Sequence, residues 1–539
     1  MKIYRLHVLL STDSRSILRG ALEVETKLKE EIIKKGLENE VQILRTGGWG
    51  IEEGVQLTVY PGGLIYVINN VEDIPYLVEE HFLKGRPVKK LMYEIDAPAK
   101  VEMTAPIEEE IMKKQTRIIL RNVGLINPED IKEYIAHDGY QALAQVLSAM
   151  TPEQVISEIK ASELSGRGGA GFPTGFKWEL TAKAPAKPKY IICNADEGEP
   201  GTFKDRVIME GDPHSIIESM AIAAYAVGAN KGFIYVRGEY DLSIDRLNIA
   251  IKQSKEIGLL GNNILGTNFD FDVEVRIGAG SYVCGEETAL MESLEGKRGE
   301  PRSKPPYPST EGLWAKPTVI NNVETLANIP LIILKGAEWY KGLGVEGSRG
   351  TKVFTLFGDV NAKGVIEVPF GFTLKELIYE IGYGIKGGKN LKLVQLGGSS
   401  GSFITPEHLD VPIDWNSVRK IGAGQGSGAI LVLDETRCVI DFLKNLLAFF
   451  NHESCGKCVP CRVGLPKALD LLNRVTSGNV EIDELGFMEE LANVMKNTSF
   501  CGLGQAAANQ ILESLKYFKS EFINHIETGY CPANKCGRL

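Results

Sequence analysis

Four cysteines near the carboxyl end constrain this chain more than any other feature of its sequence. Cys455, Cys458 and Cys461 occur in ESCGKCVPCRVG with two residues between neighbours, and Cys501 follows later in SFCGLGQ. Three thiolates at this pitch, completed by a remote fourth, are typical of the ligands of a four-iron cluster. Structural zinc sites more often combine two Cys-x2-Cys pairs or Cys and His pairs. The spacing therefore favours a 4Fe-4S cluster over zinc or free thiols.

The distribution of cysteine along the chain agrees with this interpretation. The first 192 residues contain none, and six of the nine cysteines fall from Cys455 onward. Clustered thiols in a long chain without a signal-peptide pattern indicate metal or cluster ligands in a reducing compartment, so we expect a cytoplasmic location. No stretch approaches the roughly 18 consecutive apolar residues of a membrane helix. The net charge of -10 argues against nucleic-acid binding.

Changes in hydrophobic periodicity predict a multidomain α/β protein, and 539 residues are enough for several domains. Strands such as KYIICNA and GFIYVRG alternate with amphipathic helices in the centre, whereas helical spacing dominates the carboxyl end. The predicted units are a thioredoxin-like domain (1–96), a polar linker (97–119), a Rossmann-like α/β core (120–345), a β-grasp module (346–432), a helical bundle carrying the cluster (433–528) and a cysteine-containing tail (529–539).

A glycine-rich segment, SGRGGAGFPTGFKW, occupies residues 165–178. So many glycines in a short loop allow a ligand to approach the backbone closely. The loop lacks the Gly-Lys-Ser/Thr ending of a P-loop, and its spacing differs from the GxGxxG dinucleotide pattern. On its own, the segment is a weak indication of a bound cofactor.

Three further segments give the glycine-rich loop more weight: NADEGEPGTFKDR at 194–206, GAGSYVCGEETAL at 278–290 and PTVINNVETLANIP at 317–330. With the cysteine motif, they resemble the NADH-binding flavoprotein subunit of respiratory complex I and its soluble relatives in NAD-dependent hydrogenases, formate dehydrogenases and electron-bifurcating complexes. The resemblance extends from about residue 120 to 528. It implies an NAD(H)-dependent flavoprotein oxidoreductase of the NADH dehydrogenase or diaphorase type. In such a subunit FMN exchanges hydride with NADH, and a 4Fe-4S cluster relays single electrons to partner subunits.

The resemblance also implies which residues hold each ligand, although each residue alone would fit an ordinary surface or core role. Short amides and hydroxyls suit a flavin phosphate, and aromatic rings suit a nucleotide base. Glu199 and Lys177 are the expected catalytic residues, and Leu180 replaces a stacking aromatic of some relatives, which leaves the preference for adenine open. The positions matching FMN ligands are Gly166, Arg167, Gly168, Gly169, Lys177, Asn194, Asp196, Tyr282, Gly285, Glu286, Asn321, Asn322 and Thr325. Those matching NADH ligands are Phe172, Glu199, Tyr282, Glu287 and Lys304.

The N-terminal domain departs from the pattern of its relatives. Many of them carry a two-iron cluster there on four cysteines, but this chain has Ser11 and Ser16 and the stretch around Gly48 and Glu52. Serine and glycine do not replace soft thiolate ligands. We therefore expect the fold without its cluster, acting as a docking surface. The alternative to an enzyme is a non-catalytic docking subunit that retains the flavoprotein fold.

The tail HIETGYCPANKCGRL contains a second group of candidate ligands, His525, Cys531 and Cys536. Zinc with a fourth ligand from elsewhere and free thiols are both compatible with this spacing. The remaining cysteines, Cys193, Cys284 and Cys438, lie in apolar segments and are expected to be small buried side chains.

The partners implied by the resemblance are other redox subunits. They are a small two-iron thioredoxin-like subunit and a larger iron-sulfur or catalytic subunit of the hydrogenase, formate dehydrogenase or aldehyde dehydrogenase type, with ferredoxin as a further candidate. The reaction direction, the choice between NAD and NADP, and electron bifurcation stay open, because they rest on analogy alone.

Overall fold

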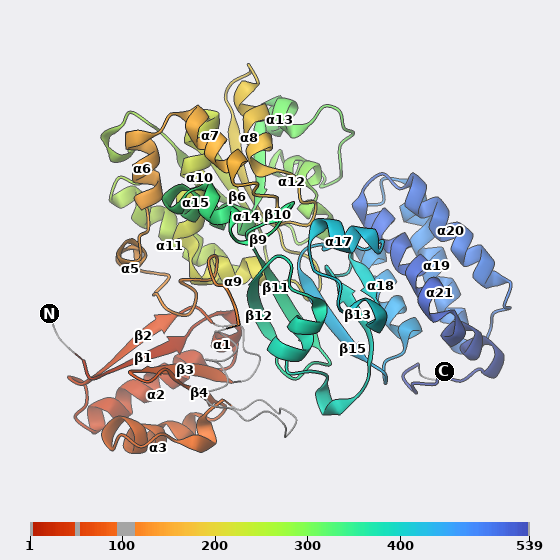
Figure 1. The fold of residues 1–539 in the computed structure, drawn as a ribbon, viewed down its shortest axis with the longest axis horizontal. Helices are drawn as coiled ribbons and strands as arrows, with labels where there is room; N and C mark the ends of the chain where they lie inside the picture. Colours follow the sequence, from red (N-terminus) through yellow and green to blue (C-terminus); the bar gives the residue numbers. More distant parts are fainter. Residues whose placement is uncertain (1–3, 49–53, 94–113, 537–539) are drawn as a thin grey trace.

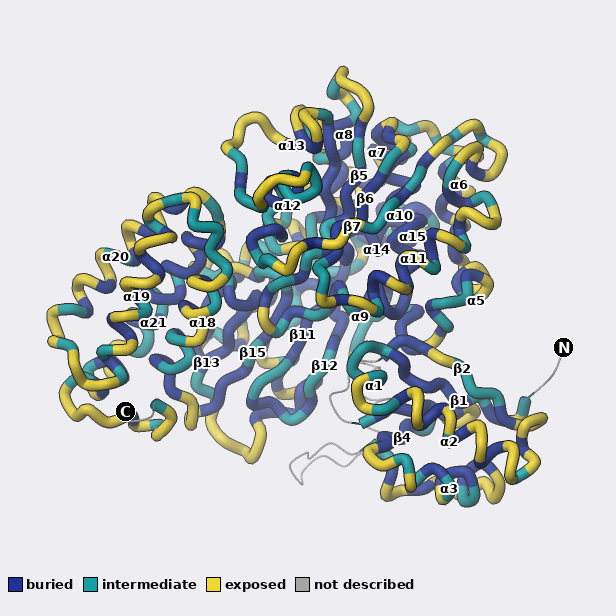
Figure 2. The backbone as a smooth tube through the Cα atoms, turned by 180° about the vertical axis from the view of Figure 1, so that it is seen from behind, coloured by how far each residue is buried: buried dark blue, intermediate teal, exposed yellow. Residues whose placement is uncertain are grey.

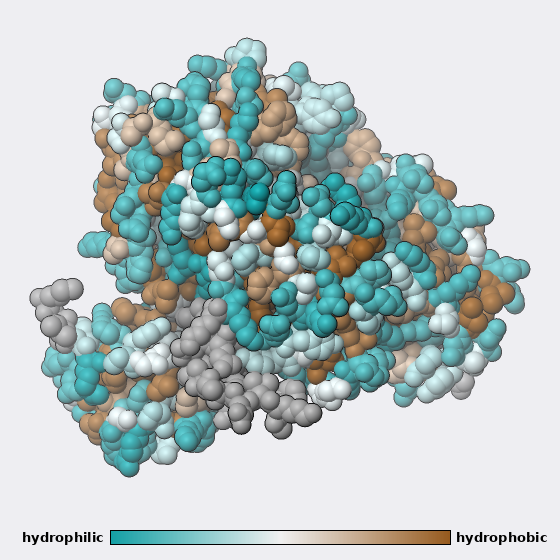
Figure 3. Space-filling model, in the orientation of Figure 1, coloured by the Kyte–Doolittle hydropathy of each residue, from teal (hydrophilic) through white to brown (hydrophobic). Residues whose placement is uncertain are grey.

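The computed structural model describes residues 4–48, 54–93 and 114–536 of the chain. It confirms the predicted mixed α/β multidomain class, with three larger sheets followed by a helical bundle (Figure 1). Most of the predicted linker lies outside the described residues. No helix in the described part combines the length and apolar character needed to cross a membrane. The face drawn in Figure 3 accordingly mixes hydrophilic and hydrophobic residues without a continuous apolar belt.

The N-terminal unit is a four-stranded sheet in the order β2 (Val41–Thr46), β1 (Leu6–Ser11), β3 (Val55–Tyr60) and β4 (Leu64–Ile68). β1 and β2 run parallel, whereas the β1–β3 and β3–β4 pairs are antiparallel. The helices beside the sheet in Figure 1 are α2 (Ala21–Lys34) and α3 (Ile74–Leu77). Buried Val8, Leu28 and Phe82 belong to the core between sheet and helices. The unit therefore has its own hydrophobic core.

The central sheet is entirely parallel, in the order β7 (Asp272–Gly278), β6 (Lys231–Arg237), β5 (Tyr190–Ala195) and β8 (Thr318–Asn322). Successive residues of β5 pack into different cores. Ile191 shares a core with α10 (Pro213–Val227), while Ile192 shares one with α12 (Glu287–Leu294). Burial on both faces explains the continuous apolar run of this strand. Figure 2 shows β5 and β6 largely in the colour of buried backbone.

The order of the central strands reverses between β5 and β8. The chain adds β6 and β7 on one side of β5 and then places β8 on the other. In parallel sheets such a reversal opens a crevice beyond the carboxyl ends of the two strands, where ligands bind. Asn194 near the end of β5 is in register with Asn322 at the end of β8. Two of the four segments that carry the resemblance therefore meet at this crevice.

A third sheet follows, in the order β12 (Gly364–Pro369), β11 (Thr351–Gly358), β15 (Ala429–Asp434), β13 (Leu391–Leu396) and β14 (Ser402–Ile404). β11 and β15 pair in parallel, and the other neighbours are antiparallel. The helical segment Glu376–Ile381 contributes Leu377 and Ile378 to a core shared with Phe354 and Val432 of the sheet.

The carboxyl end is a bundle of α18 (Val439–Glu453), α19 (Val459–Ser477), α20 (Glu484–Thr498) and α21 (Gly502–Thr528). Its core continues into the central unit, since Leu443 of α18 and Leu290 of α12 belong to the same buried cluster. The cysteine-bearing helices are therefore packed directly against one side of the central unit (Figure 1).

Candidate functional site

The glycine-rich loop forms a tight hairpin at the crevice. The amide of Gly166 donates to the carbonyl of Phe172 at 2.9 Å and closes the loop. Gly169 has a φ of 122°, in the region that favours glycine. A Cβ added to Gly168 would lie 3.1 Å from the Cβ of Asn322. The loop therefore lies against the end of β8 with room for backbone alone.

A cavity of about 670 Å³ opens between this loop and the ends of β5 and β8. Its volume is within the range of roughly 300 to 1,000 Å³ that is usual for small-molecule sites. Most of the residues expected to hold FMN or NADH line it: Gly166, Gly168, Phe172, Lys177, Asn194, Gly285, Glu286, Glu287, Lys304, Asn321, Asn322 and Thr325. The other expected residues are not among its lining: Arg167, Gly169, Asp196, Glu199 and Tyr282.

Two lysines and two glutamates form a linked charge group on the cavity wall. Lys304 Nζ lies 2.7 Å from Glu287 and 3.1 Å from Glu286, and Lys177 Nζ lies 3.5 Å from Glu287. Burial would raise the pKa of Glu287, but Lys177 and Lys304 outweigh it, so the pKa is lowered. Glu287 therefore remains an anionic hydrogen-bond acceptor at neutral pH.

The side chain of Arg167 is fully buried and does not line the cavity. Its guanidinium donates to the Ser165 carbonyl at 2.6 Å, the Thr351 carbonyl at 3.0 Å and the Tyr340 hydroxyl at 3.0 Å. It also lies 4.7 Å from the ring centre of Phe370. These contacts fix the glycine loop to the third sheet, so Arg167 shapes the cavity from behind.

A buried cluster of charged side chains supports the same wall of the cavity. The sequence alone did not predict this cluster. Lys352 Nζ lies 2.6 Å from Glu324, and Lys204 Nζ lies 3.0 Å from Glu324 and 2.7 Å from Asp205. Asp205 in turn accepts a hydrogen bond of 2.7 Å from Asn322 at the cavity. Burial lowers the pKa of Lys352 to about 8, against the opposing effect of Glu324. The one indication of this charge cluster in the sequence is that Lys204 and Asp205 lie in the motif at 194–206 and Glu324 lies in the motif at 317–330.

Glu199 and Tyr282 lie together at the junction of three units. Glu199 accepts hydrogen bonds from the Ser400 amide at 2.7 Å, the Ser400 hydroxyl at 2.6 Å and the Tyr282 hydroxyl at 3.3 Å. The ring of Tyr282 packs against Phe449 of α18, with centroids 5.2 Å apart. Burial and the neighbouring Glu199 carboxylate raise the pKa of Tyr282, so its hydroxyl stays protonated.

Asp196 follows β5 and has an unusual carboxyl group. Its Oδ2 is buried without a hydrogen-bond partner among the described residues. Burial raises the pKa of Asp196 to about 7, helped by Glu239 and Glu453 and opposed by Arg237. This carboxyl group therefore changes its charge near neutral pH.

Cys455, Cys458, Cys461 and Cys501 line one small cavity. Cys458 immediately precedes α19 and Cys501 immediately precedes α21. Free amides at helix starts favour negative charge, as in a cluster with thiolate ligands. Burial raises the pKa of Cys461 to about 11, and the three other thiols add to this effect. Four thiolates at this place thus need a metal centre to hold them, which fits an iron-sulfur cluster.

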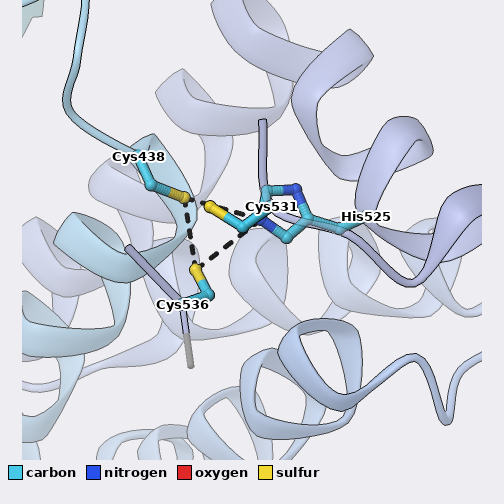
Figure 4. A group of neighbouring side chains, drawn as sticks. All are labelled: Cys438, His525, Cys531 and Cys536. Carbon is cyan, nitrogen blue, oxygen red and sulfur yellow. Dashed lines mark hydrogen bonds between the residues drawn. The ribbon is translucent and has the colours of Figure 1, made fainter. Parts of the chain in front are cut away.

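A second group of ligand side chains gathers at the other end of α18 (Figure 4). The Sγ atoms of Cys438 and Cys536 lie 3.4 Å apart, and each is 3.6 Å from His525 Nε2. Cys531 completes the group, in which all ligand atoms lie within 4.8 Å of one another. Cys438 is buried as expected, but its place here was missed because it lies 87 residues before His525.

Serines occupy the positions of the N-terminal unit at which many relatives have cluster cysteines. These serines are hydrogen-bonded to each other and to Asp13. Ser11 and Ser16 donate to Asp13 at 2.7 and 2.9 Å, and their own hydroxyl oxygens lie 2.9 Å apart. Ser14 donates through its amide and its hydroxyl to Glu210 of the central unit, at 3.0 and 2.5 Å. Glu52 lies outside the described residues. The loop therefore contacts the central unit through the amide and the hydroxyl of Ser14.

Comparison with known proteins assigns two regions of the chain. Residues 159–331 match the Nuo51 FMN-binding domain, and residues 441–525 match the NADH-ubiquinone oxidoreductase-F iron-sulfur binding region. The HndC subunit of the NADP-reducing hydrogenase of Solidesulfovibrio fructosivorans is 50% identical over 427 residues, covering 79% of this chain and 87% of the relative. An NADH-quinone oxidoreductase F-type subunit of Rhizobium meliloti is 46% identical over 415 residues, covering 77% of this chain and 99% of the relative.

A solved structure resembles nearly the whole chain. It is the NAD+-reducing [NiFe]-hydrogenase in the H2-reduced state, with a TM-score of 0.67 and 27% sequence identity. The similarity covers 97% of this chain and 84% of that one. It therefore includes the N-terminal unit as well as the regions matched by sequence.

Proposed function

This chain belongs to the family of NADH-quinone oxidoreductase F subunits, and we propose that it exchanges hydride with a nicotinamide dinucleotide and relays electrons to partner subunits. The observation that carries the proposal is the cavity at the ends of β5 and β8, packed beside a bundle with four cysteines around a second cavity. FMN, when bound, supplies the conversion between two-electron and one-electron chemistry, which side chains alone do not provide.

We assign the inner part of the larger cavity to FMN. Gly166 and Gly168 let the ligand approach their backbone, and Asn194 is fixed by a hydrogen bond of 2.8 Å to the Gly285 carbonyl. Asn322 is likewise held by Asp205, which aims its side chain at the cavity. Amides held in this way orient a flavin and its phosphate at little entropic cost.

We assign the outer part of the cavity to the dinucleotide. Phe172 is 44% exposed at the rim, where its ring can stack on a base. Glu287 is kept ionised by Lys177 and Lys304, so it can accept hydrogen bonds from ribose hydroxyls. Lys177 also donates to the Ile320 carbonyl at 3.0 Å, which fixes its ammonium group beside the flavin region. Glu199 acts from behind as a positioning residue, because it holds Tyr282 and Ser400.

The four bundle cysteines hold the 4Fe-4S cluster, and the surface beside them is apolar. Val459, Val463 and Phe500 are 58%, 49% and 42% exposed next to these cysteines. Exposed apolar side chains grouped in this way mark a protein interface. We propose that the larger iron-sulfur or catalytic subunit docks there and takes the electrons.

We propose that the chain divides into a thioredoxin-like domain (1–96), a linker (97–119), a Rossmann-like core (120–345), a β-grasp module with the third sheet (346–432), a helical bundle (433–528) and a tail (529–539). The N-terminal domain carries no cluster and faces a small two-iron thioredoxin-like subunit. The candidate partners are hydrogenase, formate dehydrogenase and aldehyde dehydrogenase subunits, and ferredoxin as an electron acceptor in a bifurcating complex. Identifying the protein that co-purifies with the chain distinguishes among them.

The experiment that tests this function combines cofactor analysis with reduction by the substrate. Protein purified without oxygen should contain about one FMN and about four irons per chain, and NADH or NADPH should bleach the flavin absorbance. About six irons with a two-iron signal would contradict the cluster-free N-terminal domain. A protein without flavin, or one whose flavin neither dinucleotide reduces, would favour the non-catalytic docking subunit.

A further inference from the structure

We infer that Cys438, His525, Cys531 and Cys536 form a mononuclear zinc site that fastens the C-terminal tail to the start of α18. The two tail cysteines follow the end of α21, whereas Cys438 directly precedes α18. The site therefore joins three parts of the bundle end that are distant in sequence. It lies apart from both cavities assigned above, and the inference does not depend on the proposed function.

The distances fit one tetrahedral metal ion. Zinc-ligand bonds of about 2.3 Å to sulfur place ligand atoms about 3.8 Å apart in a tetrahedron. The measured separations are 3.4 Å between Cys438 and Cys536, and 3.6 Å from each of these to His525. Every pair of ligand atoms lies within 4.8 Å. One metal ion can therefore reach all four ligands together.

The surrounding backbone orients the ligands. The Nδ1 atom of His525 lies 2.7 Å from the Glu521 carbonyl, so that nitrogen carries the proton and Nε2 presents its lone pair to the thiols. The amide of Lys535 donates to Cys531 Sγ at 3.4 Å, and the amide of Asp441 donates to Cys438 Sγ at 3.5 Å. Such amide hydrogen bonds stabilise thiolates, the form in which cysteine binds metal.

Ligand chemistry and burial favour zinc in a structural role. A set of three thiolates and one imidazole is a common closed zinc site, in which four protein ligands leave no position for substrate. Cys438, His525 and Cys531 are only 3%, 2% and 5% exposed, so solvent has little access to the ion. Zinc has no accessible redox step and does not compete for the electrons of the neighbouring cluster.

The position of the site suggests what the zinc stabilises. α18 has 15 residues and spans about 22 Å at 1.5 Å per residue. Its first turn lies at the zinc ligands, and its last residue, Glu453, directly precedes the cysteine loop of the cluster. Zinc thus secures one end of the helix whose other end leads to the cluster. It closes the bundle and takes no part in electron transfer.

The test is a metal inventory of the full chain and of single alanine variants. We expect about one zinc per chain in the wild type, together with its FMN and its cluster iron. Cys531→Ala and Cys536→Ala should each lose at least about 80% of the zinc and keep FMN and iron. Cys193→Ala, which removes a buried thiol of β5 elsewhere, should keep the zinc. Because both tail cysteines follow the last bundle helix, their variants remain informative if Cys438→Ala fails to fold.

Zinc-edge X-ray absorption of the wild type provides the second readout. Three sulfurs at about 2.3 Å and one nitrogen at about 2.0 Å support the assignment. Wild-type protein without zinc after expression in zinc-containing medium would overturn it, as would a Cys438–Cys536 disulfide or iron that is lost only in the tail variants. Zinc that survives in both tail variants would place the ion elsewhere and equally refute the site.

Discussion

The backbone amide of Tyr282 donates a hydrogen bond of 2.9 Å to the carboxylate of Glu453. Tyr282 lies in the segment that continues into the cavity wall at Gly285, and Glu453 is the last residue of α18. The cysteine loop begins two residues later, at Cys455. This contact therefore sets the position of the cluster loop relative to the dinucleotide cavity.

Removal of this contact should slow electron transfer between the two cofactors. We expect Glu453→Ala to lower NADH-dependent reduction of the native acceptor about tenfold, equivalent to about 1.4 kcal/mol in the barrier, while FMN and iron contents stay at wild-type levels. Glu453→Gln keeps an acceptor oxygen, so its rate of acceptor reduction should lie between those of the wild type and Glu453→Ala. Glu490→Ala, at an exposed position of α20, is the matched control. An unchanged rate in Glu453→Ala would show that the contact does not position the loop.

The lysine on the cavity wall should affect the dinucleotide and leave the flavin in place. Lys304→Met removes the cation that contacts Glu286 and Glu287. We expect the apparent KM for NADH to rise about tenfold, since about 1.4 kcal/mol of binding free energy is lost. Bound FMN should remain, as measured after desalting. Lys183→Met, a charge removal at an exposed site, should behave like the wild type. Loss of FMN with an unchanged KM would assign Lys304 to the flavin instead.

Arg167 should be needed for flavin retention although its side chain does not line the cavity. Lysine cannot reproduce the forked hydrogen bonds to Ser165, Thr351 and Tyr340. We expect Arg167→Lys to lose about 3 kcal/mol of stability, a typical cost of unpaired buried groups, and to retain less FMN. Flavin content and the melting temperature measure both effects. Arg419→Lys, at an exposed position of α17 (Trp415–Lys420), serves as control. A wild-type flavin content and melting temperature in Arg167→Lys would mean that the loop holds its shape without the arginine side chain.

The carboxyl group of Asp196 should make stability depend on pH. Its pKa is raised to about 7 by burial, so the folded protein keeps a proton that the unfolded chain loses near pH 4. The contribution of Asp196 to folding stability is therefore fully present below about pH 4 and falls by up to about 4 kcal/mol as the pH rises towards 7. Asp196→Asn cannot titrate. We expect the melting temperature of the wild type to fall relative to that of this variant between about pH 5 and 7, whereas a constant difference would contradict the buried titration.

Much of the fold could be predicted because the patterns are local. The apolar run of β5 and the helical spacing in α18 to α21 identify buried strands and amphipathic helices directly. The strand order β7, β6, β5, β8 could not be predicted in this way, because it depends on pairing between segments that are distant in the sequence. The motif at Asn194 and the motif at Asn322 could be recognised singly, but only the reversal of strand order brings them to one crevice.

The candidate site was predictable where residues act through a motif, and unpredictable where they act through tertiary contacts. The spacing of Cys455, Cys458 and Cys461 predicts that they act together, whereas Cys438 has no spacing relation to the tail thiols and needs the packing of α18 on α21. The resemblance implied that Arg167 is one of the FMN ligands. Its side chain is directed backward because buried carbonyl groups around it require a donor.

The central claim is that electrons leave through the cluster held by the bundle, and Cys458→Ser tests it most directly. A hydroxyl is a poor ligand for iron-sulfur clusters, so the variant should lose its cluster, while the cavity, built from other segments, keeps FMN. NADH-dependent reduction of an artificial dye and of the native acceptor should be measured at matched flavin content, in the wild type and in the variant. We predict that dye reduction persists and that reduction of the native acceptor falls to background. Wild-type rates in both assays, with the cluster absent, would contradict the account.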